Sequence, residues 1–499
     1  MTTQSIDPRT GITFGPELDD SSDEQVRQAC LEAEQAAPVW AALAPPRRAG
    51  VLEALADALD AEAARLVQLA DSETALGSAR LTGEVARTTF QLRMLAEAIR
   101  DGSYTRPLVD EPVTGAPPEG HPQICRMLAP IGPVAVYAAS NFPFAFSVAG
   151  GDTASALAAG CTVVVKAHPG HPQTSEVVHG ILRDALIAAR MPAGMIGMVR
   201  GFGAGAALIR DPAIRAGAFT GSQRGGRALF DLAAGRPDPI PFYGELGSVN
   251  PVVVLPSAVS REKLASDYVD SLLLGAGQFC TNPSLLFVPA GADLIDEIAR
   301  EIATRNAGVM LYPGVLENLE QSVELVAAAE GVTVLAGSRE NAAGDGGRGL
   351  ARSPLLFGVD ASQLLADRTP LEVECFGPVG VLAGYVTSAE LLAVLSSLDG
   401  ALAGCVHGET SDPDARAVIA ALAQRVGRVA WNAWPTGVSV NRAQHHGGPW
   451  PATTSPLHTS VGVTAIRRFL RPVAFQAVPE ELLPSAARLP ESASTVTTD

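Results

Sequence analysis

Apolar residues recur at helical spacing through the first hundred residues of the chain. Residues 22–100 are rich in Ala, Leu, Glu and Arg, and Val51, Leu52, Leu55 and Leu59 follow the spacing of one helix face. This spacing puts apolar side chains on one side of a helix and charged side chains on the other. The segment therefore predicts amphipathic helices that pack against a core.

The pattern changes after Pro133, where short runs of valine and alanine alternate with longer helical stretches. Val134–Tyr137 and Thr162–Val165 are such runs, and helical stretches follow within residues 154–159 and 177–190. Valine-rich runs bounded by Gly and Pro are typical of parallel strands buried on both faces. The alternation predicts βαβ units and an α/β fold with a doubly wound sheet.

The same alternation resumes after Glu245, which indicates a second domain. Pro251–Leu255 and Ser284–Val288 read as strands, with a helix near residues 261–274 between them. The chain has 499 residues, more than the roughly 250–300 that one core supports. We expect a domain boundary near residues 245–250. Residues 104–120 read as a connection, 467–476 as a strand, and the Ser/Thr/Ala-rich residues 485–499 as a mobile tail.

Composition and charge exclude several classes of protein. Hydrophobic residues make up 47% and charged residues 18%, with a formal net charge of -17 and no basic block, so binding to nucleic acid is not expected. Six scattered cysteines without a C-x-x-C pair suggest neither a disulfide framework nor a zinc site, and we expect no metal. The polar N-terminus is unlike a signal peptide, and Pro and Gly interrupt the apolar stretch 131–159, so we expect a cytoplasmic protein without membrane spans.

One cysteine stands in a setting suited to nucleophilic chemistry. Cys280 lies in Gly275-Ala-Gly-Gln-Phe-Cys-Thr-Asn282, between glycine-rich backbone and small polar residues. The thiolate is the reactive form and needs an anion-friendly backbone with access to substrate. The alternative is a buried structural cysteine. Glu245, in Tyr243-Gly-Glu-Leu-Gly247, is a candidate general base if burial raises the pKa of its carboxyl. Its alternative is a solvated loop carboxylate.

Several segments could bind a dinucleotide or stabilise charge. Phe219-Thr-Gly-Ser-Gln-Arg-Gly-Gly226 joins a predicted strand to a predicted helix, as anion-binding turns do, although an ordinary turn fits too. Lys166 ends a strand, where it either reaches a cofactor or only caps the strand. Asn141 precedes Phe142-Pro143 and either donates to an oxyanion or forms an Asx-turn. Within Glu372-Val-Glu-Cys-Phe-Gly-Pro378, either glutamate could hold a ribose, or both could be solvated.

Taken together and in this order, these segments resemble the aldehyde dehydrogenase superfamily from about Pro133 to about Phe469. The resemblance implies that Cys280 is the nucleophile, that Glu245 is the general base, and that Asn141 shares the oxyanion hole with the Cys280 backbone N–H. It further implies a thioester formed as hydride passes to a nicotinamide dinucleotide, then hydrolysed by water that Glu245 activates. The implied cofactor contacts are Lys166 at the adenosine ribose, Phe219, Gly221, Ser222 and Gly226 at the pyrophosphate, and Glu374 and Phe376 at the nicotinamide riboside.

The resemblance also implies an organisation into domains. Residues 1–122 and 132–245 would form the dinucleotide-binding domain, and 246–445 the catalytic domain. Residues 123–131 and 466–480 would form a small β-flap that builds a homodimer or homotetramer. Two departures stand out: Ser248 replaces a usual glycine, and Lys166-Ala-His-Pro lacks a carboxylate common three residues after the lysine. Without that carboxylate a 2′-phosphate would meet no repulsion, so we expect NADP, with NAD tolerated, and His168 and Arg200 as phosphate partners.

Four stretches are similar to one subgroup, the 2,5-dioxovalerate (α-ketoglutaric semialdehyde) dehydrogenases and the related NADP-dependent long-chain aldehyde enzymes: 139–152, 166–172, 277–283 and 446–452. The first substrate needs a cationic anchor, for which Arg442 is the candidate unless it is a surface arginine. Phe142, Phe144, Phe146 and Phe279 could wall a tunnel in either case, whereas Trp431, Trp434 and Trp450 either line it or simply pack. A CoA-acylating enzyme and a catalytically silent relative remain alternatives.

Overall fold

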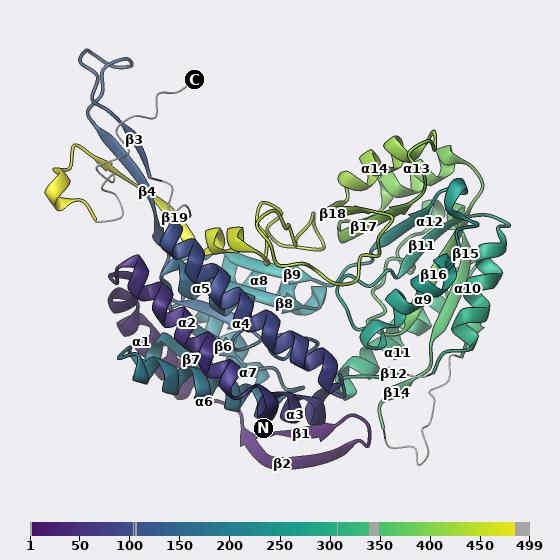
Figure 1. Ribbon diagram of the computed structural model, residues 1–499, viewed down its shortest axis with the longest axis horizontal. Helices are drawn as coiled ribbons and strands as arrows, with labels where there is room; N and C mark the ends of the chain where they lie inside the picture. The colour runs from purple at the N-terminus through teal and green to yellow at the C-terminus, as the bar shows by residue number, and fades with distance from the viewer. Residues whose placement is uncertain (1, 103, 105–106, 307, 339–348, 485–499) are drawn as a thin grey trace.

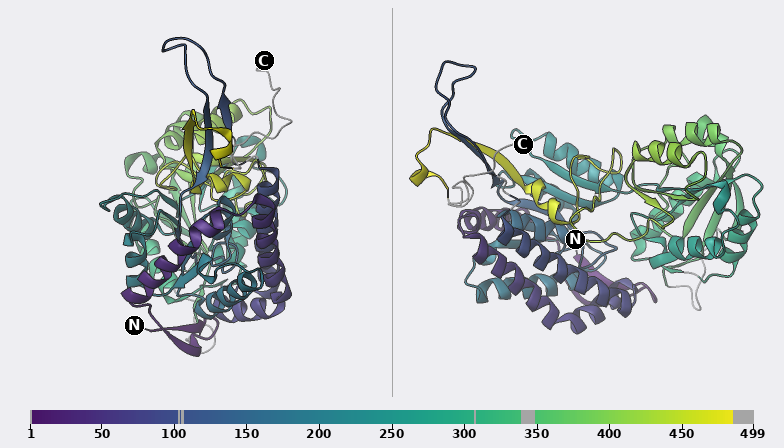
Figure 2. Two further views of the ribbon diagram at one scale, coloured as in Figure 1. Left: turned by 90° about the vertical axis from the view of Figure 1, so that its left-hand side faces the viewer. Right: turned by 45° about the horizontal axis from the view of Figure 1, so that its top comes forward.

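The computed structural model describes residues 2–102, 104, 107–306, 308–338 and 349–484 of the chain. Its two larger sheets lie side by side in the long direction of the molecule, each with helices against it (Figure 1). A small third sheet stands away from the body (Figure 2). The mobile tail expected at residues 485–499 lies outside the described part of the chain.

The predicted N-terminal helices are present. They are α1 (Asp23–Ala41), α2 (Pro45–Ala61), α3 (Ala63–Thr74) and α4 (Ser78–Asp101). A capping box of Ser22 and Gln25 begins α1, because each side chain bonds to the other's backbone N–H. Leu52 and Leu55 of α2 lie in one core with Leu92 and Leu95 of α4, as the apolar spacing predicts. The helix α4 also carries Arg80 and Arg87, which lie beside Phe142 and Phe146.

The first large sheet is parallel throughout, in the order β7-β6-β5-β8-β9. Side chains of one strand alternate between two cores: Val134 and Val136 face one, whereas Ala135 and Tyr137 face the other. The strands are β5 (Val134–Tyr137), β6 (Val163–Lys166), β7 (Ile196–Val199), β8 (Ala216–Gly221) and β9 (Phe242–Leu246), connected by α5 (Gly151–Ala159), α6 (Pro172–Ala188), α7 (Phe202–Arg210) and α8 (Gln223–Ala234). Strand order reverses between β5 and β8, and the carboxyl ends of the strands at such a point are where sheets of this kind bind ligands.

The second large sheet follows in the chain, in the order β13-β15-β16-β11-β10-β17-β18. It is parallel, as predicted, with β13 added antiparallel to β15 at the edge. Its strands are β10 (Pro251–Val254), β11 (Leu285–Pro289), β13 (Thr333–Gly337), β15 (Leu355–Asp360), β16 (Val379–Tyr385), β17 (Ala401–His407) and β18 (Val426–Trp431), with α9 (Leu264–Leu273), α10 (Asp293–Ala303), α11 (Pro313–Ala327), α12 (Ala361–Ala366), α13 (Ser388–Ser397) and α14 (Ala415–Ala423).

The small sheet has the order β19-β4-β3, formed by β3 (Leu108–Asp110), β4 (Ile124–Pro130) and β19 (Leu470–Gln476). Two expectations are corrected here. Residues 104–120 are not only a connection, since they contain β3, and the predicted strand begins at Leu470 because Val463–Phe469 is a 3-10 helix. An N-terminal hairpin of β1 (Thr2–Asp7) and β2 (Ile12–Asp19) was also not predicted, and β12 (Gly308–Val309) pairs with β14 (Ala351–Arg352).

The chain after β18 returns to the first sheet, and this return positions the site. Leu246 N–H donates to Ala452 O at 2.8 Å, and Thr454 N–H donates to Gly244 O at 3.0 Å, so the segment runs along β9. It thereby brings residues 446–460 beside Glu245. Among the described residues, no helix is long and apolar enough to cross a membrane.

Candidate active site

Cys280 lies in the turn between α9 and β11, which is held by an unusual backbone. Gly275, Ala276 and Gly277 all have positive φ, at 58°, 57° and 72°. A side chain at Gly277 would place its Cβ 2.0 Å from Gly377 O, so only glycine fits. Asn250, fully buried, donates from Nδ2 to Cys280 O at 2.9 Å and to Asn282 O at 3.0 Å. The cysteine is thus fixed from both sides, and it is the one cysteine of the six that is not fully buried.

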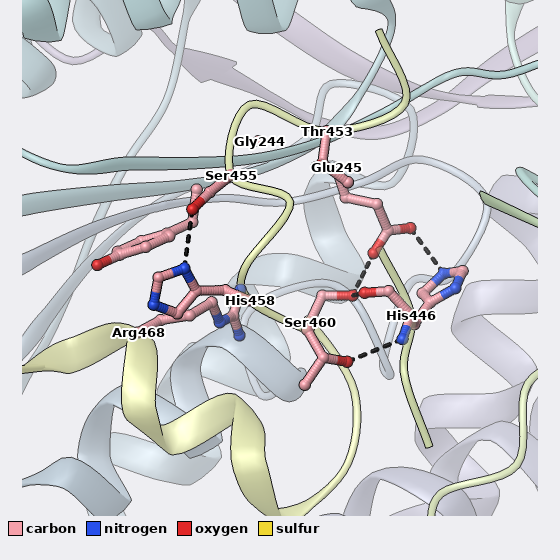
Figure 3. Close-up of a pocket in the computed structure, with 10 residues that line it drawn as sticks. Gly244, Glu245, His446, Thr453, Ser455, His458, Ser460 and Arg468 are labelled. Carbon is pink, nitrogen blue, oxygen red and sulfur yellow. Dashed lines mark hydrogen bonds and ion pairs between the residues drawn. The ribbon is translucent and has the colours of Figure 1, made fainter. Parts of the chain in front are cut away.

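Cys280, His446 and Glu245 form one contiguous cluster. His446 Nε2 lies 2.8 Å from Glu245 Oε1 and 3.7 Å from Cys280 Sγ. Ser460 donates from its hydroxyl to the other oxygen of Glu245, as Figure 3 shows. Backbone contacts hold the histidine, because Thr459 Oγ1 accepts from His446 N–H at 2.8 Å and His446 O accepts from Ser460 N–H at 2.9 Å.

The electrostatics of this cluster differ from the sequence-based expectation. Burial alone raises the pKa of Glu245, but the His446 contact, the Ser460 hydroxyl and the Arg468 guanidinium outweigh it and leave the pKa below its usual value. The expected net rise was therefore wrong, and Glu245 is a carboxylate at neutral pH. Burial, with the negative charges of Glu245 and Glu374, raises the pKa of Cys280 well above its usual value. The resting sulfur is thus a thiol that a neighbouring base must deprotonate.

Asn141 lies beside the turn that carries Cys280. It is buried at the carboxyl end of β5, and its Nδ2 donates to Gln278 O at 2.9 Å, two residues before the cysteine. Its backbone carbonyl accepts from Arg80 Nη2 at 2.6 Å. Among the described contacts, this bond uses one of the two hydrogens of the amide.

Lys166 and Arg200 end neighbouring strands at the crevice. Lys166 of β6 pairs with Val199 of β7, and Arg200 comes next in the chain. Burial lowers the pKa of Lys166 to about 8, against the opposing effect of Asp20. Arg200 forms an ion pair with Glu176 and donates from Nε to Asp19 O at 3.2 Å. The two cations therefore end neighbouring strands, each with a carboxylate close to it.

His168 is unsuited to the phosphate contact expected of it. Burial, then the neighbouring His171 and Lys166, lower the pKa of His168 well below its usual value, so the ring is neutral. The ring packs against His171 and Tyr312 at centroid distances of 5.6 and 5.2 Å, and its Nδ1 accepts from Gly170 N–H. A neutral ring brings no charge to a phosphate, so of the two expected partners only Arg200 remains.

The glycine turn after β8 begins a helix, as predicted. Ser222 caps α8 by accepting from Gly225 N–H at 3.2 Å. A Cβ at Gly226 would lie 2.1 Å from Leu246 Cδ2, which shows how closely α8 approaches β9. Phe219 packs edge-on to Tyr137 and against Phe242, so its ring supports the turn. Gly221 and the first N–H groups of α8 thus face the carboxyl edge of the sheet.

Glu374, rather than Glu372, lies near the cysteine. Its carboxylate rests on Gly247, where an added Cβ would lie 1.8 Å from Oε2. Burial, opposed by a hydrogen bond from the Ser248 backbone, raises the pKa of Glu374 to about 8. Glu372 instead accepts from Asp399 N–H at 2.7 Å and pairs with Arg368 at 2.8 Å. Phe376 packs at the edge of the second sheet's core. The unusual Ser248 bonds to Asn250 Oδ1 at 3.1 Å.

Three of the four expected phenylalanines meet beside the site. Phe142 lies 5.3 Å from Phe146 and 5.4 Å from Phe279 between ring centroids, and Phe146 lies 6.4 Å from the His446 ring. The expectation for Phe144 was wrong, because it is buried in the core of the first sheet. None of the tryptophans contacts these rings in the described structure: Trp431 and Trp434 pack against the second sheet's cores, and Trp450 is half exposed.

Arg442, the expected carboxylate anchor, is exposed. No contact with Cys280 or the phenylalanines is found for it in the described part of the chain, which favours its alternative reading as a surface arginine. The sequence reasoning also missed His446, Ser460 and Asn250. Only His446 gave a signal, since it opens a stretch already noted for its subgroup resemblance. Cys280, Glu245 and His446 are also the single group of potential metal ligands found among the described residues. The same arrangement suits acyl transfer, and the absence of a metal stays a prediction.

Comparison with known proteins decides the family. A sequence model of the aldehyde dehydrogenase family matches residues 1–449. The chain belongs to this family. As an aldehyde dehydrogenase, it oxidises an aldehyde with a nicotinamide dinucleotide as the hydride acceptor.

Two relatives match nearly the whole of this aldehyde dehydrogenase. Alpha-ketoglutaric semialdehyde dehydrogenase 2 of Azospirillum brasilense is 41% identical over 492 residues, 97% of this chain and 93% of the relative. An alpha-ketoglutaric semialdehyde dehydrogenase of Acinetobacter baylyi is 39% identical over 472 residues, 93% and 89% of the two chains. Aldehyde dehydrogenase C of Pseudomonas syringae, solved with NAD+ and octanal, has a TM-score of 0.80 at 22% identity and covers 95% of this chain and 93% of its own. That structure shares the fold.

Proposed function

We propose that this aldehyde dehydrogenase oxidises 2,5-dioxovalerate (α-ketoglutaric semialdehyde) to 2-oxoglutarate through a thioester on Cys280. The observation that carries the chemistry is the contact of His446 Nε2 with both Cys280 Sγ, at 3.7 Å, and Glu245 Oε1, at 2.8 Å. The substrate is supported by the two relatives that share about 40% of their residues with this chain.

The catalytic roles follow from the positions of the side chains. The Cys280 thiol passes its proton to the His446–Glu245 pair, and the sulfur adds to the aldehyde carbon to form a thiohemiacetal. Asn141 Nδ2 and the Cys280 N–H donate to the resulting alkoxide. The nicotinamide ring, when bound, accepts the hydride that leaves this carbon. After the proton from the thiol has left this pair for solvent, Glu245 takes a proton from the water that attacks the thioester carbon, the C–S bond breaks, and Cys280 leaves as the thiolate.

The crevice of the first sheet fits a dinucleotide. Gly226 lets α8 lie against β9, which directs the first N–H groups of α8 to the carboxyl edge where pyrophosphate would bind. Lys166 would hold the adenosine ribose, and Glu374 and Phe376 would hold the nicotinamide riboside. In this assignment residues 1–122 and 132–245 bind the dinucleotide, and residues 246–445 carry the nucleophile.

We further propose that NADP is preferred. In the family, a carboxylate that binds the ribose is common three residues after the lysine, where this chain has Pro169. Arg200 lies at the end of the neighbouring strand. A guanidinium suits a phosphate, although Arg200 must share its contact with Glu176. The β3–β4–β19 sheet would join two or four copies, and the cytoplasm is the expected compartment.

A panel of aldehydes tests this function. We expect kcat/KM for α-ketoglutaric semialdehyde to exceed the values for succinic semialdehyde and a long-chain alkanal, without added CoA. Cys280→Ala should abolish turnover and leave no acyl-enzyme detectable by mass spectrometry. A preference for the long-chain alkanal would instead favour the fatty-aldehyde alternative, and a CoA requirement would indicate acyl transfer to CoA. Normal dehydrogenase rates in Cys280→Ala would overturn the mechanism.

A further inference from the structure

Two arginines of α4 lie beside the site, although no residue of this helix has a role in the mechanism above. Arg80 and Arg87 are seven positions apart, so they share one face of the helix. The Arg80 guanidinium lies 5.0 Å from the Phe142 ring centroid and 4.7 Å from that of Phe279. The Arg87 guanidinium lies 5.7 Å from the Phe146 ring centroid. Both cations therefore border the phenylalanine cluster beside Cys280.

Arg80 already has a structural partner. Its Nη2 donates to the backbone carbonyl of Asn141 at 2.6 Å, and its Nη1 is packed so closely that a Cβ at Gly275 would lie 2.4 Å away. It thus joins α4 to the two loops that carry Asn141 and Cys280. A side chain held in this way supports the geometry of the site for every aldehyde.

The guanidinium of Arg87 makes a hydrogen bond at one edge and has no hydrogen-bond partner at its other edge. Its Nη1 donates to Val438 O at 2.7 Å, in the loop that follows β18. Its Nε and Nη2 are buried and have no hydrogen-bond partner. These two groups form the side of a guanidinium that binds a carboxylate with two parallel hydrogen bonds. A buried guanidinium edge without a partner is costly unless a ligand completes it.

The neighbouring carboxylates leave the Nε–Nη2 edge of Arg87 unpaired. Glu84, between the two arginines on the same helix, is buried, and its Oε1 accepts from Phe144 N–H at 2.8 Å and Ala145 N–H at 3.0 Å. It forms no ion pair with Arg80 or Arg87 among the described residues. Cys280 and Glu245 lie close enough to interact electrostatically with Arg87. The guanidinium is therefore within electrostatic reach of a short substrate on the sulfur.

We propose that Arg87 binds, through Nε and Nη2, the substrate carboxylate at the end opposite the aldehyde. This proposal rests on the proposed function, because only an aldehyde that also carries a carboxylate can make the contact. The phenylalanines contact the carbon chain between the two ends, while Cys280 takes the aldehyde carbon. Arg87 thus selects α-ketoglutaric semialdehyde over an uncharged aldehyde of equal length, the role that Arg442 was expected to have.

The test compares α-ketoglutaric semialdehyde with pentanal in Arg87→Met, which keeps the aliphatic contact with Phe146. We expect kcat/KM for the charged substrate to fall about 10- to 100-fold, mainly through KM, and its ratio to that for pentanal to fall by a similar factor. Inhibition by the product 2-oxoglutarate should weaken in parallel. Arg87→Lys should recover only part of the loss, because an ammonium lacks the two-pronged edge.

Two matched arginine variants separate the possible outcomes. Arg442→Ala should leave both substrates unaffected, whereas Arg80→Met should slow both alike. If Arg87→Met lowers both substrates equally, or slows alkylation of Cys280 by iodoacetamide, Arg87 supports the thiolate and the proposal is wrong. If the native enzyme itself prefers pentanal, the proposed substrate fails. If it prefers the charged aldehyde and Arg87→Met keeps that preference, only the role of Arg87 fails.

Discussion

Ser460 and His446 bind the two oxygens of one buried carboxylate, that of Glu245. The two residues come from a single returning segment, while Glu245 ends a strand of the first sheet. Glu245 therefore stays ionised in spite of its burial, and its basicity depends on residues more than 200 positions away along the chain.

Glu245→Gln should separate the two halves of the reaction. If the carboxylate acts mainly in hydrolysis, the first turnover gives a burst of reduced cofactor, and steady turnover falls about 10²- to 10⁴-fold. Loss of the negative charge should also lower the pKa of Cys280, since Glu245 helps to raise it. Stopped-flow absorbance and the pH dependence of iodoacetamide alkylation measure the two effects. A lost burst with slower alkylation would show that Glu245 is required to deprotonate the thiol.

His446→Ala should move the pH profile of steady turnover. Without the histidine, burial acts on Glu245 with less opposition, so the pKa of its carboxyl rises. A base is inactive below its pKa, and the acidic limb of kcat should therefore shift to higher pH. Ser460→Ala removes one hydrogen bond to the same carboxylate, so it should shift the acidic limb in the same direction, but by a smaller amount than His446→Ala does. An unchanged limb in both variants would mean that another group controls it.

Sequence periodicity was sufficient for the larger sheets because it is a local property. Val134–Tyr137 and Pro251–Val254 are strands where the valine runs predicted them, and their side chains alternate between two cores. Short strands such as Leu108–Asp110 were missed, since a mostly exposed strand of three residues is too short to show such a pattern. His446 could not be paired with Glu245 in advance, because the returning segment that joins them has neither helical nor strand period. Arg87 was missed because an arginine in an amphipathic helix is ordinarily on the solvated face.

Arg200→Ala tests the cofactor preference. If Arg200 contacts a 2′-phosphate, kcat/KM for NADP should fall about 10-fold while that for NAD changes by less than about 3-fold. Glu176→Gln is the matched variant, because it frees Arg200 from its ion pair and should improve the ratio of NADP to NAD. Steady-state kinetics with both cofactors measure the ratio. A native enzyme with a strong NAD preference, unaffected by either change, would refute the proposal.

Asn250→Ala should destabilise the turn that carries the nucleophile. The asparagine is fully buried, donates to the carbonyls of Cys280 and Asn282, and accepts from Ala403 N–H at 3.0 Å. Its removal leaves these groups unpaired at a cost of about 2–4 kcal/mol, so the thermal midpoint and kcat should both fall. Asn441→Ala is the control, since Asn441 is exposed and, among the described residues, its side chain accepts one hydrogen bond, from Ala443 N–H at 3.1 Å. The thermal midpoint of this variant should barely change. Differential scanning calorimetry with activity assays distinguishes the two, and equal midpoints would show that the turn is held without Asn250.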